Sequence, residues 1–136
     1  MWGLLWNLQG EKNVKSLLFY SPDAMKFLHI DDVEGERLGE SALRKILVYS
    51  ENLMLMYTEA MPGGQIISHS HPHEQLTYVI QGTAELKASG ETVILKAGSS
   101  ALLEANEYHE IRGIGDEKGI VLDVFHPHRE DYLPKE

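Results

Sequence analysis

Side chains that can bind a metal are concentrated near the middle of the chain, where seven positions contain His69, His71, His73, Glu74 and Gln75. They come directly before an apolar run that is typical of a β-strand. Successive side chains of an extended chain point to opposite faces, so His69, His71 and Gln75 share a parity and can converge on one point. This convergence predicts a metal site.

The ligand types restrict the ion. Imidazole nitrogens together with an amide oxygen suit zinc, nickel, manganese or iron better than calcium or magnesium. Ligands from one strand leave the cage open on one side, so we expect a further histidine from elsewhere, and His109 is the candidate. His73 follows Pro72, which disturbs the strand, and we place it at the rim. His126 and His128 lie near the C-terminal end and are left outside the site.

Gln75 changes the charge of the expected site, because its side chain is neutral where a glutamate would carry a negative charge. A divalent ion held by three histidines and Gln75 keeps its full positive charge. It would bind less tightly but would polarise a carbonyl or anionic ligand more strongly. The alternative is a degenerate site that has lost its metal.

A second informative stretch, VLDVFHPHREDYL, runs from residue 121 to residue 133. On a strand, Asp123 and Phe125 share a face, and a carboxylate among apolar residues is costly unless it is used or paired. Otherwise Asp123 lies exposed at a strand end. Arg129 follows a bend and can fold back to bind a carboxylate bidentately. The alternative is a surface arginine paired with Glu130 or Asp131.

Composition limits the classes of partner. The 136 residues carry 12 basic and 21 acidic side chains, a formal net charge of -9, which argues against DNA and RNA. Cysteine is absent, which excludes disulfides and thiolate ligands and fits a cytoplasmic setting. The apolar N-terminus is too short to span a bilayer, so we expect no membrane partner.

The hydrophobic pattern predicts a chain dominated by short strands. A run at residues 14–20 is a possible further strand, residues 22–30 allow one helical turn, and residues 31–41 are expected to form a surface loop. The strands are then expected at residues 43–49, 53–58, 75–81, 83–88, 92–96, 100–103, 109–114 and 119–125, with the histidine segment before residue 75. This spacing favours a barrel or sandwich.

The spacing of Gly63, His69, His71, Gln75 and Gly82 resembles the first motif of the cupin superfamily, with Gln75 where most members have glutamate. In that motif five residues separate the first glycine from the first histidine, one separates the histidines, three precede the acidic position, and six precede the last glycine. The match is specific.

The second cupin motif is recognisable but altered. Gly98 lies eleven residues before His109, as the motif expects. Glu104 stands at the usual proline, Asn106 at the usual glycine and Gly113 at the usual asparagine.

A closer resemblance is to the small cupins that open unsaturated uronate rings in pectin degradation. The segments that carry it are HSHPHEQ, the later histidine, and DVF followed by a proline and RED. The resemblance implies metal ligands at His69, His71, Gln75 and His109. It implies reaction roles for Asp123, Phe125 and Arg129. The chain departs from that family at His126 and His128, in a segment that is usually small and proline-rich, and at Glu104, which replaces a proline.

We therefore expect an all-β protein with a single domain over residues 1–136. The fold is a cupin jelly-roll barrel with its core at about residues 43–129, preceded by an N-terminal arm, strand and loop at residues 1–42. Jelly rolls commonly hide edges in a two-fold dimer, so we expect a homodimer. Its candidate contacts are Trp2, Leu5 and Trp6.

The expected function is metal-dependent isomerase or lyase-like chemistry on a small anionic sugar, with one divalent ion, Zn, Ni, Mn or Fe. Two alternatives remain open at this point. One is a cupin dioxygenase of the flavonol or acireductone type, which needs a redox metal and oxygen. The other is a sugar-binding or sensor cupin without catalysis.

Overall fold

The computed structural model describes residues 25–134, apart from the side chains of residues 65–69. The possible strand at residues 14–20 and the proposed dimer contacts Trp2, Leu5 and Trp6 lie outside the described residues. The chain divides into two units between Glu34 and Gly35, and each is considered by itself. Among residues 25–134, no helix is long and apolar enough to cross a membrane.

Within the described part of the first unit, the helical turn lies at the end of the range expected for one. Residues 25–29 have no regular structure, and the 3₁₀-helix η3 covers Ile30–Asp32. Its N-cap is His29, whose Nδ1 accepts a hydrogen bond from the backbone N–H of Asp31 at 3.1 Å. A side-chain acceptor at this position satisfies an N–H that the short helix leaves without a backbone partner.

The second unit is built from antiparallel strands, and the expectation of an all-β jelly roll is confirmed. The C-terminal segment adds the 3₁₀-helix η4 at Glu130–Tyr132. The strands are β1 Glu36–Leu38, β2 Ala42–Tyr49, β3 Met54–Ala60, β4 Gln65–His69, β5 Glu74–Gln81, β6 Thr83–Ala88, β7 Glu91–Lys96, β8 Ser100–Leu103, β9 His109–Ile114 and β10 Gly119–His126.

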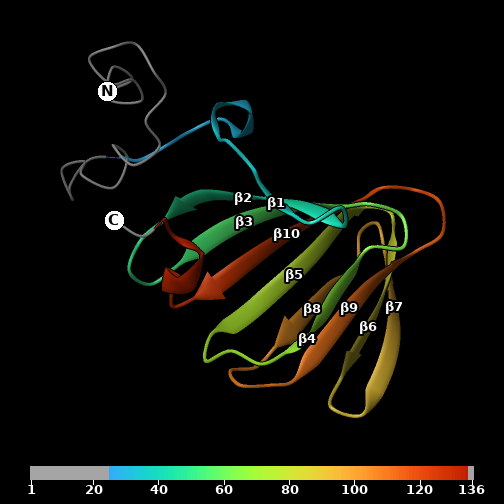
Figure 1. Cartoon of the computed structure of the whole chain (residues 1–136). Helices are drawn as coiled ribbons and strands as arrows, with labels where there is room; N and C mark the ends of the chain where they lie inside the picture. The colour runs from blue at the N-terminus through green and yellow to red at the C-terminus, as the bar shows by residue number, and fades with distance from the viewer. Residues whose placement is uncertain (1–24, 135–136) are drawn as a thin grey trace. The chain divides into compact units, whose positions relative to one another are not determined.

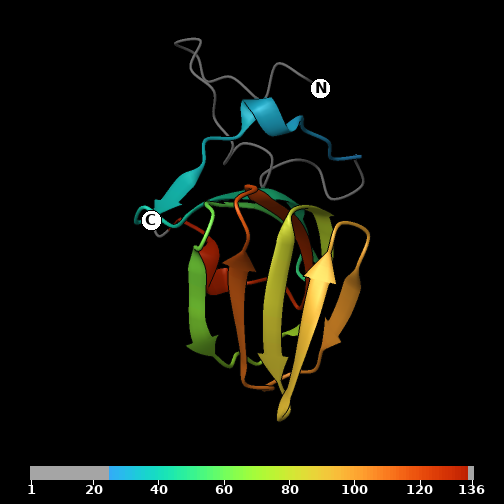
Figure 2. The ribbon, with the colours of Figure 1, turned by 90° about the vertical axis from the view of Figure 1, so that its right-hand side faces the viewer.

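The strands form two sheets. One has the order β1-β2-β3-β10-β5-β8 and the other the order β4-β9-β6-β7 (Figure 1). Figure 2 shows the four-stranded sheet face on, with β9 between β4 and β6. The chain passes between the sheets after β3, β4, β5, β7, β8 and β9, so residues close in sequence contribute to opposite sides of the barrel.

Strand β10 holds the middle of the larger sheet, since it pairs with β3 on one side and with β5 on the other. In this register Asp123 lies opposite Met56 of β3 and Thr77 of β5. Phe125 lies opposite Met54 and Gln75. The two candidate reaction residues of β10 are therefore fixed by ladders on both sides.

Part of the expected surface loop at residues 31–41 is a strand. Its residues 36–38 form β1, which pairs with β2 and places Glu36 opposite Arg44. The Arg44 Nη2 to Glu36 Oε2 distance is 2.8 Å. The loop prediction was wrong here because these three residues carry no strand pattern of their own, and the pairing with β2 makes them a strand.

Buried side chains form two apolar clusters inside the barrel. One contains Val79, Leu86, Leu95 and Leu103, and the other contains Met54, Met56 and Phe125. Strand β5 alternates strictly between buried odd-numbered and exposed even-numbered residues over positions 74–80. It pairs with β10 and β8, and its odd-numbered face carries Gln75 and Thr77 into the interior.

Gly82 joins β5 to β6 and gives a prediction for stability. Its φ is +87°, and an added Cβ would lie 2.9 Å from the Cα of Gly119, which is backbone. Gly90 has a φ of +75° but no atom within 4 Å of such a Cβ. We expect Gly90→Ala to lower the free energy of unfolding by about 1 kcal/mol, from backbone strain alone, and Gly82→Ala by at least about 2 kcal/mol more.

Urea denaturation monitored by circular dichroism would compare the two glycine variants. The matched pair separates the clash with Gly119 from the cost of positive φ, since both positions share the latter. Equal losses of stability would contradict the assigned close approach of the two chain segments.

Candidate functional site

A cavity of about 80 Å³ lies inside the barrel between the two sheets. This is several times the space that one bound water needs. Its walls come from β3, β5, β6, β8, β9, β10 and the C-terminal segment. The polar side chains that line it are Thr58, Gln75, Thr77, Gln81, Thr83, His109, Asp123, Arg129 and Tyr132. Most of these are predicted site residues or their direct hydrogen-bond and ring neighbours.

Three of the four predicted metal ligands lie together beside this cavity. His71, Gln75 and His109 are all buried. The His71 Nε2 to Gln75 Oε1 distance is 3.0 Å, and the rings of His71 and His109 meet edge to face with centroids 5.0 Å apart.

The predicted ligands do not lie on one strand, so the parity argument that grouped them was wrong. β4 ends at His69, β5 begins at Glu74, and His71 lies in the connection between the two sheets. Gln75 then comes from the larger sheet and His109 from the smaller one. The ligands are brought together by the closure of the barrel.

The fourth predicted ligand, His69, has its side chain outside the described residues. Its backbone lies opposite His109 in the ladder between β4 and β9. The described part of the chain contains no group of three or more His, Cys, Asp or Glu side chains that could hold a metal ion. This statement covers only two of the four predicted ligands, His71 and His109. The side chain of His69 is not described, and Gln75 is not one of the four residue types.

The described donors fit a metal ion in their chemistry. The carbonyl oxygen of Glu107 can only accept, so the ring Nδ1 of His109 donates to it at 2.9 Å. This sets the tautomer in which Nε2 carries the lone pair, as in histidines that bind metals. Two ligand atoms about 2.1 Å from one ion, at a right angle, lie about 3.0 Å apart. The separation of His71 Nε2 and Gln75 Oε1 matches that value.

Gln75 and Asp123 are linked through Thr77. Gln75 Nε2 donates to Thr77 Oγ1 at 2.9 Å and to Asp123 Oδ1 at 3.0 Å. Thr77 Oγ1 donates to the same Asp123 oxygen at 2.6 Å. Sequence reasoning missed Thr77, although its parity with Gln75 on β5 was a signal that the two side chains share a face.

Asp123 lies on the interior face of β10 and is 7% exposed. Burial raises the pKa of Asp123 to about 6, and hydrogen bonds from Thr77 and Gln75 and the charge of Arg129 limit this rise. A carboxyl with a pKa near neutrality can both take up and return a proton. The alternative of an exposed aspartate at a strand end does not match this position.

Arg129 has features of both alternatives given by the sequence, an arginine available to bind a carboxylate and an arginine paired with a local acid. Its Nε and Nη2 donate to the carboxylate of Asp131 at 3.0 and 2.7 Å, the expected local pairing. The residue is nevertheless 5% exposed and lines the cavity. Its Nη1 is buried and has no hydrogen-bond partner among the described residues. Asp131 therefore occupies the Nε and Nη2 edge of the guanidinium, and the N–H groups of Nη1 are left over.

Aromatic rings fix the position of the guanidinium. The Cζ of Arg129 lies 5.0 Å from the ring centroid of Phe125 and 3.9 Å from that of Tyr132. Arg44 lies 3.9 Å from the same Tyr132 ring. Tyr132 had no signal in the sequence, because it lies in η4 and reaches the cavity only when the C-terminal segment folds back.

The remaining histidines have separate surroundings. His73 lies beside His71 and Phe125, with ring centroids 5.5 and 6.4 Å away, and burial followed by the charge of Arg129 lowers the pKa of His73. This matches the expected rim position. His126 is exposed, and His128 bonds through Nδ1 to the carbonyl oxygen of Glu51.

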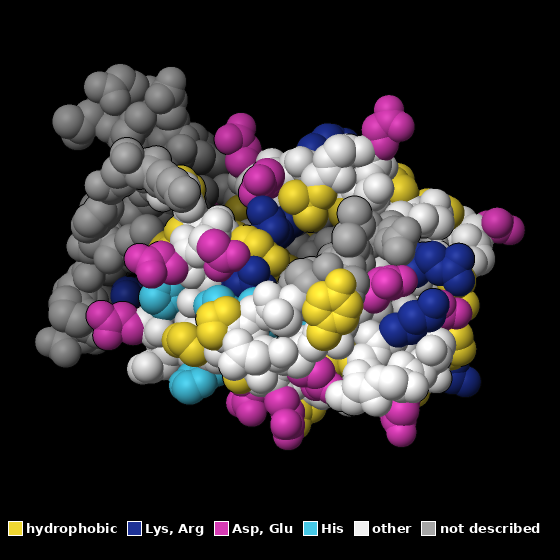
Figure 3. Space-filling view, turned by 60° about the horizontal axis from the view of Figure 1, so that its bottom comes forward, with side chains coloured by type: hydrophobic (Ala, Val, Ile, Leu, Met, Phe, Trp, Pro, Cys, Tyr) yellow, Lys and Arg dark blue, Asp and Glu magenta, His cyan; other side chains and the backbone are white. Residues whose placement is uncertain are grey.

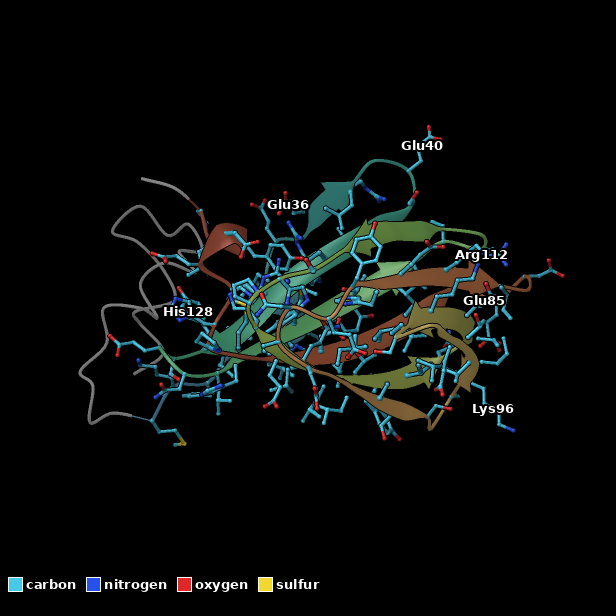
Figure 4. All side chains as sticks on the ribbon, turned by 90° about the horizontal axis from the view of Figure 1, so that it is seen from below. Glu36, Glu40, Glu85, Lys96, Arg112 and His128 are labelled. Atoms are coloured by element: carbon cyan, nitrogen blue, oxygen red, sulfur yellow. The ribbon has the colours of Figure 1, made fainter. Side chains whose placement is uncertain are left out.

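Charges on the surface are mixed in sign. Figure 3 shows acidic and basic side chains interspersed on one face, with histidines gathered on one part of it. Figure 4 shows His128 at one end of the barrel and the ion pair of Arg112 and Glu85 toward the other. Arg112 lies on the same strand as His109, but its side chain is exposed and does not line the cavity.

Comparison with known proteins places these features in a family. The family model described as Cupin domain matches residues 56–125. The chain is similar to the pectin degradation protein KdgF of Dickeya dadantii (strain 3937). The two are 34% identical over 104 residues, which is 76% of this chain and 94% of that protein.

Solved structures agree with this likeness. KdgF from Halomonas sp. is 25% identical with a TM-score of 0.76, covering 81% of this chain and all of that one. An RmlC-like cupin from Shewanella frigidimarina is 27% identical with a TM-score of 0.75, covering 81% of this chain and 97% of that one. The chain belongs to the cupin superfamily.

Proposed function

We propose that the protein is a metal-dependent enzyme that isomerises a small sugar acid, by opening the ring of an unsaturated uronate or a related compound. The observation that carries the proposal is the placement of buried Asp123 between two kinds of group. On one side Gln75 connects it to His71, whose ring meets that of His109, and on the other lies the buried Arg129. The likeness to a pectin degradation protein supports a substrate of this class.

The proposed metal ligands are His69, His71, Gln75 and His109, and the ion is Zn, Ni, Mn or Fe. A bound divalent ion supplies a Lewis acid for a substrate oxygen and needs no change of redox state for this role. Cupins commonly bind a metal, and the geometry of His71, Gln75 and His109 is compatible with that use.

The chain's own residues bind the substrate and move the proton. The buried Nη1 of Arg129 donates to the substrate carboxylate, and the ring of Phe125 forms a wall of the sugar site. Asp123 takes a proton from a substrate oxygen and returns one to the product carbon as the ring opens and the enol becomes a ketone. Reactant and product are isomers, so the proton balance closes within the site.

The direct test is turnover. Metal-loaded protein incubated with unsaturated uronates, with product detection by NMR, is expected to convert the cyclic compound to an open-chain keto acid. Retention of turnover without oxygen separates this reaction from a dioxygenase. Calorimetric binding of the same compounds with no turnover under any metal would instead support the sugar-binding or sensor alternative.

Three further expectations accompany the proposal. The domain extent 1–136, the cytoplasmic setting and the homodimer remain predictions, and light scattering after size exclusion would address the last of these. Exposed apolar residues on the outer face of the larger sheet, including Leu76 at 53% exposed, are compatible with a dimer contact.

The first prediction concerns metal content. Purified protein incubated with zinc, nickel or manganese and then desalted is expected to hold about one ion per chain, by elemental analysis. His71→Ala should lose most of this ion while keeping the fold, since the apolar clusters of the barrel do not include His71. His126→Ala, at an exposed position, is the matched control and should keep it. Wild-type protein that stays metal-free would contradict the prediction.

The second prediction concerns proton transfer. Asp123→Asn keeps the size of the side chain but removes the group that exchanges the proton. We expect the turnover number to fall by about a hundredfold or more, with metal content unchanged. Turnover at the wild-type rate in Asp123→Asn, together with loss of activity in His109→Ala, would show that the role assigned to Asp123 is wrong.

The third prediction concerns substrate binding. Arg129→Ala removes the guanidinium that faces the cavity, and we expect KM to rise by about tenfold or more with a smaller change in kcat. Arg112→Ala removes a surface guanidinium at the far end of the barrel and serves as the control (Figure 4). Equal effects of the two variants would argue against a specific anion contact at Arg129.

A further inference from the structure

Thr77 occupies an unusual place in the site. It is 4% exposed, lies two residues after Gln75 on the same face of β5, and is the register partner of Asp123 on β10. Its hydroxyl bonds to both neighbours, at 2.9 Å to Gln75 and at 2.6 Å to Asp123. The proposed function assigns no binding or catalytic role to this hydroxyl.

The direction of each hydrogen bond follows from the chemistry of the groups. The ionised Asp123 carboxylate can only accept, so both Thr77 and Gln75 donate to it. The Thr77 hydroxyl donates its one hydrogen to Asp123, and its oxygen accepts a hydrogen bond from Gln75. The amide nitrogen of Gln75 therefore donates one hydrogen bond to Asp123 and one to Thr77.

Only one orientation of the Gln75 amide satisfies this ring of bonds. A flipped amide would place its carbonyl oxygen 3.0 Å from an Asp123 oxygen, so two acceptors would face each other in a buried site. The observed orientation instead presents Oε1 to His71, the proposed metal ligand next to it. The orientation of the amide and the burial of Asp123 are thus coupled.

We propose that Thr77 is a positioning residue that, with Asp123, fixes the Gln75 amide so that its oxygen is presented toward the metal site. The same network explains why glutamine stands at position 75, since a glutamate has no N–H for Asp123 or Thr77 and would set a second carboxylate against the first. The inference rests on the proposed function only in taking Gln75 as a metal ligand.

A cycle of exchanged side chains tests the network without metal. Gln75→Glu in the wild-type background places two carboxylates together. In the Asp123→Asn background the donor and acceptor are merely swapped, because the amide introduced at position 123 can donate to the carboxylate introduced at position 75. In chelator-treated protein, we expect Gln75→Glu to lower the folding equilibrium constant at least about tenfold in the wild-type background and less than about threefold in the Asp123→Asn background. Equal losses in the two backgrounds would overturn the network.

Folding failure of one variant also decides the question. If Gln75→Glu fails to fold while the double variant folds, the coupling is supported in its extreme form. If both fail, the comparison passes to Thr77→Val and Thr77→Ser, which change a single hydroxyl. Valine matches threonine in shape but lacks the hydroxyl, and serine restores it.

The Thr77 pair has two measurements. In metal-free protein, the side-chain NH₂ protons of Gln75, assigned by their absence in Gln75→Glu, should exchange with solvent more slowly in wild type and Thr77→Ser than in Thr77→Val. Titration with Ni²⁺ should show affinity about 10- to 100-fold weaker in Thr77→Val and within about threefold of wild type in Thr77→Ser. Unchanged amide exchange and unchanged Ni²⁺ affinity in Thr77→Val would overturn the inference.

The two proposals fail in different ways. Wild-type protein that binds no metal, but shows the coupling between positions 75 and 123, would sink the metal-dependent function and leave the network standing. Full Ni²⁺ affinity in Thr77→Val, with amide exchange as in wild type, would remove the positioning role of Thr77 while leaving the proposed function intact.

Discussion

A buried carboxylate in the middle of the barrel is the constraint on which the other parts of the site depend. Asp123 lies on β10, an inner strand of the larger sheet, and its burial removes most of the solvation of its charge. An unpaired charge at such a place is costly, so the neighbouring strand must supply donors. Thr77 and Gln75 do so because the register of β5 and β10 places Thr77 opposite Asp123, with Gln75 two residues away on the same face. A slip of one residue would turn both donors to the outer face. The hydrogen bonds of the site therefore form only when β5 and β10 pair in this register.

The polar interior also depends on the connections between sheets. His71 reaches the site from the segment that leaves β4 and enters β5, and His109 comes from the opposite wall. Neither sheet alone assembles the donors, so the site forms only when the two sheets close on each other. The apolar clusters supply the burial that drives this closure. Their side chains also surround the polar groups with apolar atoms, which strengthens the electrostatic interactions of those groups.

The C-terminal segment completes the site by placing a cation where burial alone would disfavour it. Asp131 offsets the charge of Arg129, and the ring of Tyr132 lies against the guanidinium. One N–H of Arg129 stays buried and without a partner among the described residues. An unsatisfied buried donor of this kind costs stability, and the cost is offset when an anionic ligand binds. The segment thus combines a local ion pair with a buried donor at the residue that lines the cavity.

The sequence by itself determined the fold class, the family and the identity of the residues with useful chemistry. Alternating apolar residues specify strands, and the spacing of His71, Gln75 and His109 matches a motif, because both are local properties of the chain. The strand at Glu36–Leu38 and the roles of Thr77 and Tyr132 could not be found this way, since each arises from pairing or folding back across long separations. Nor could the sequence decide between an exposed and a buried Asp123, or show which groups the Arg129 guanidinium contacts. Burial and hydrogen-bond partners depend on which segments close over a residue, and only the tertiary structure decides that.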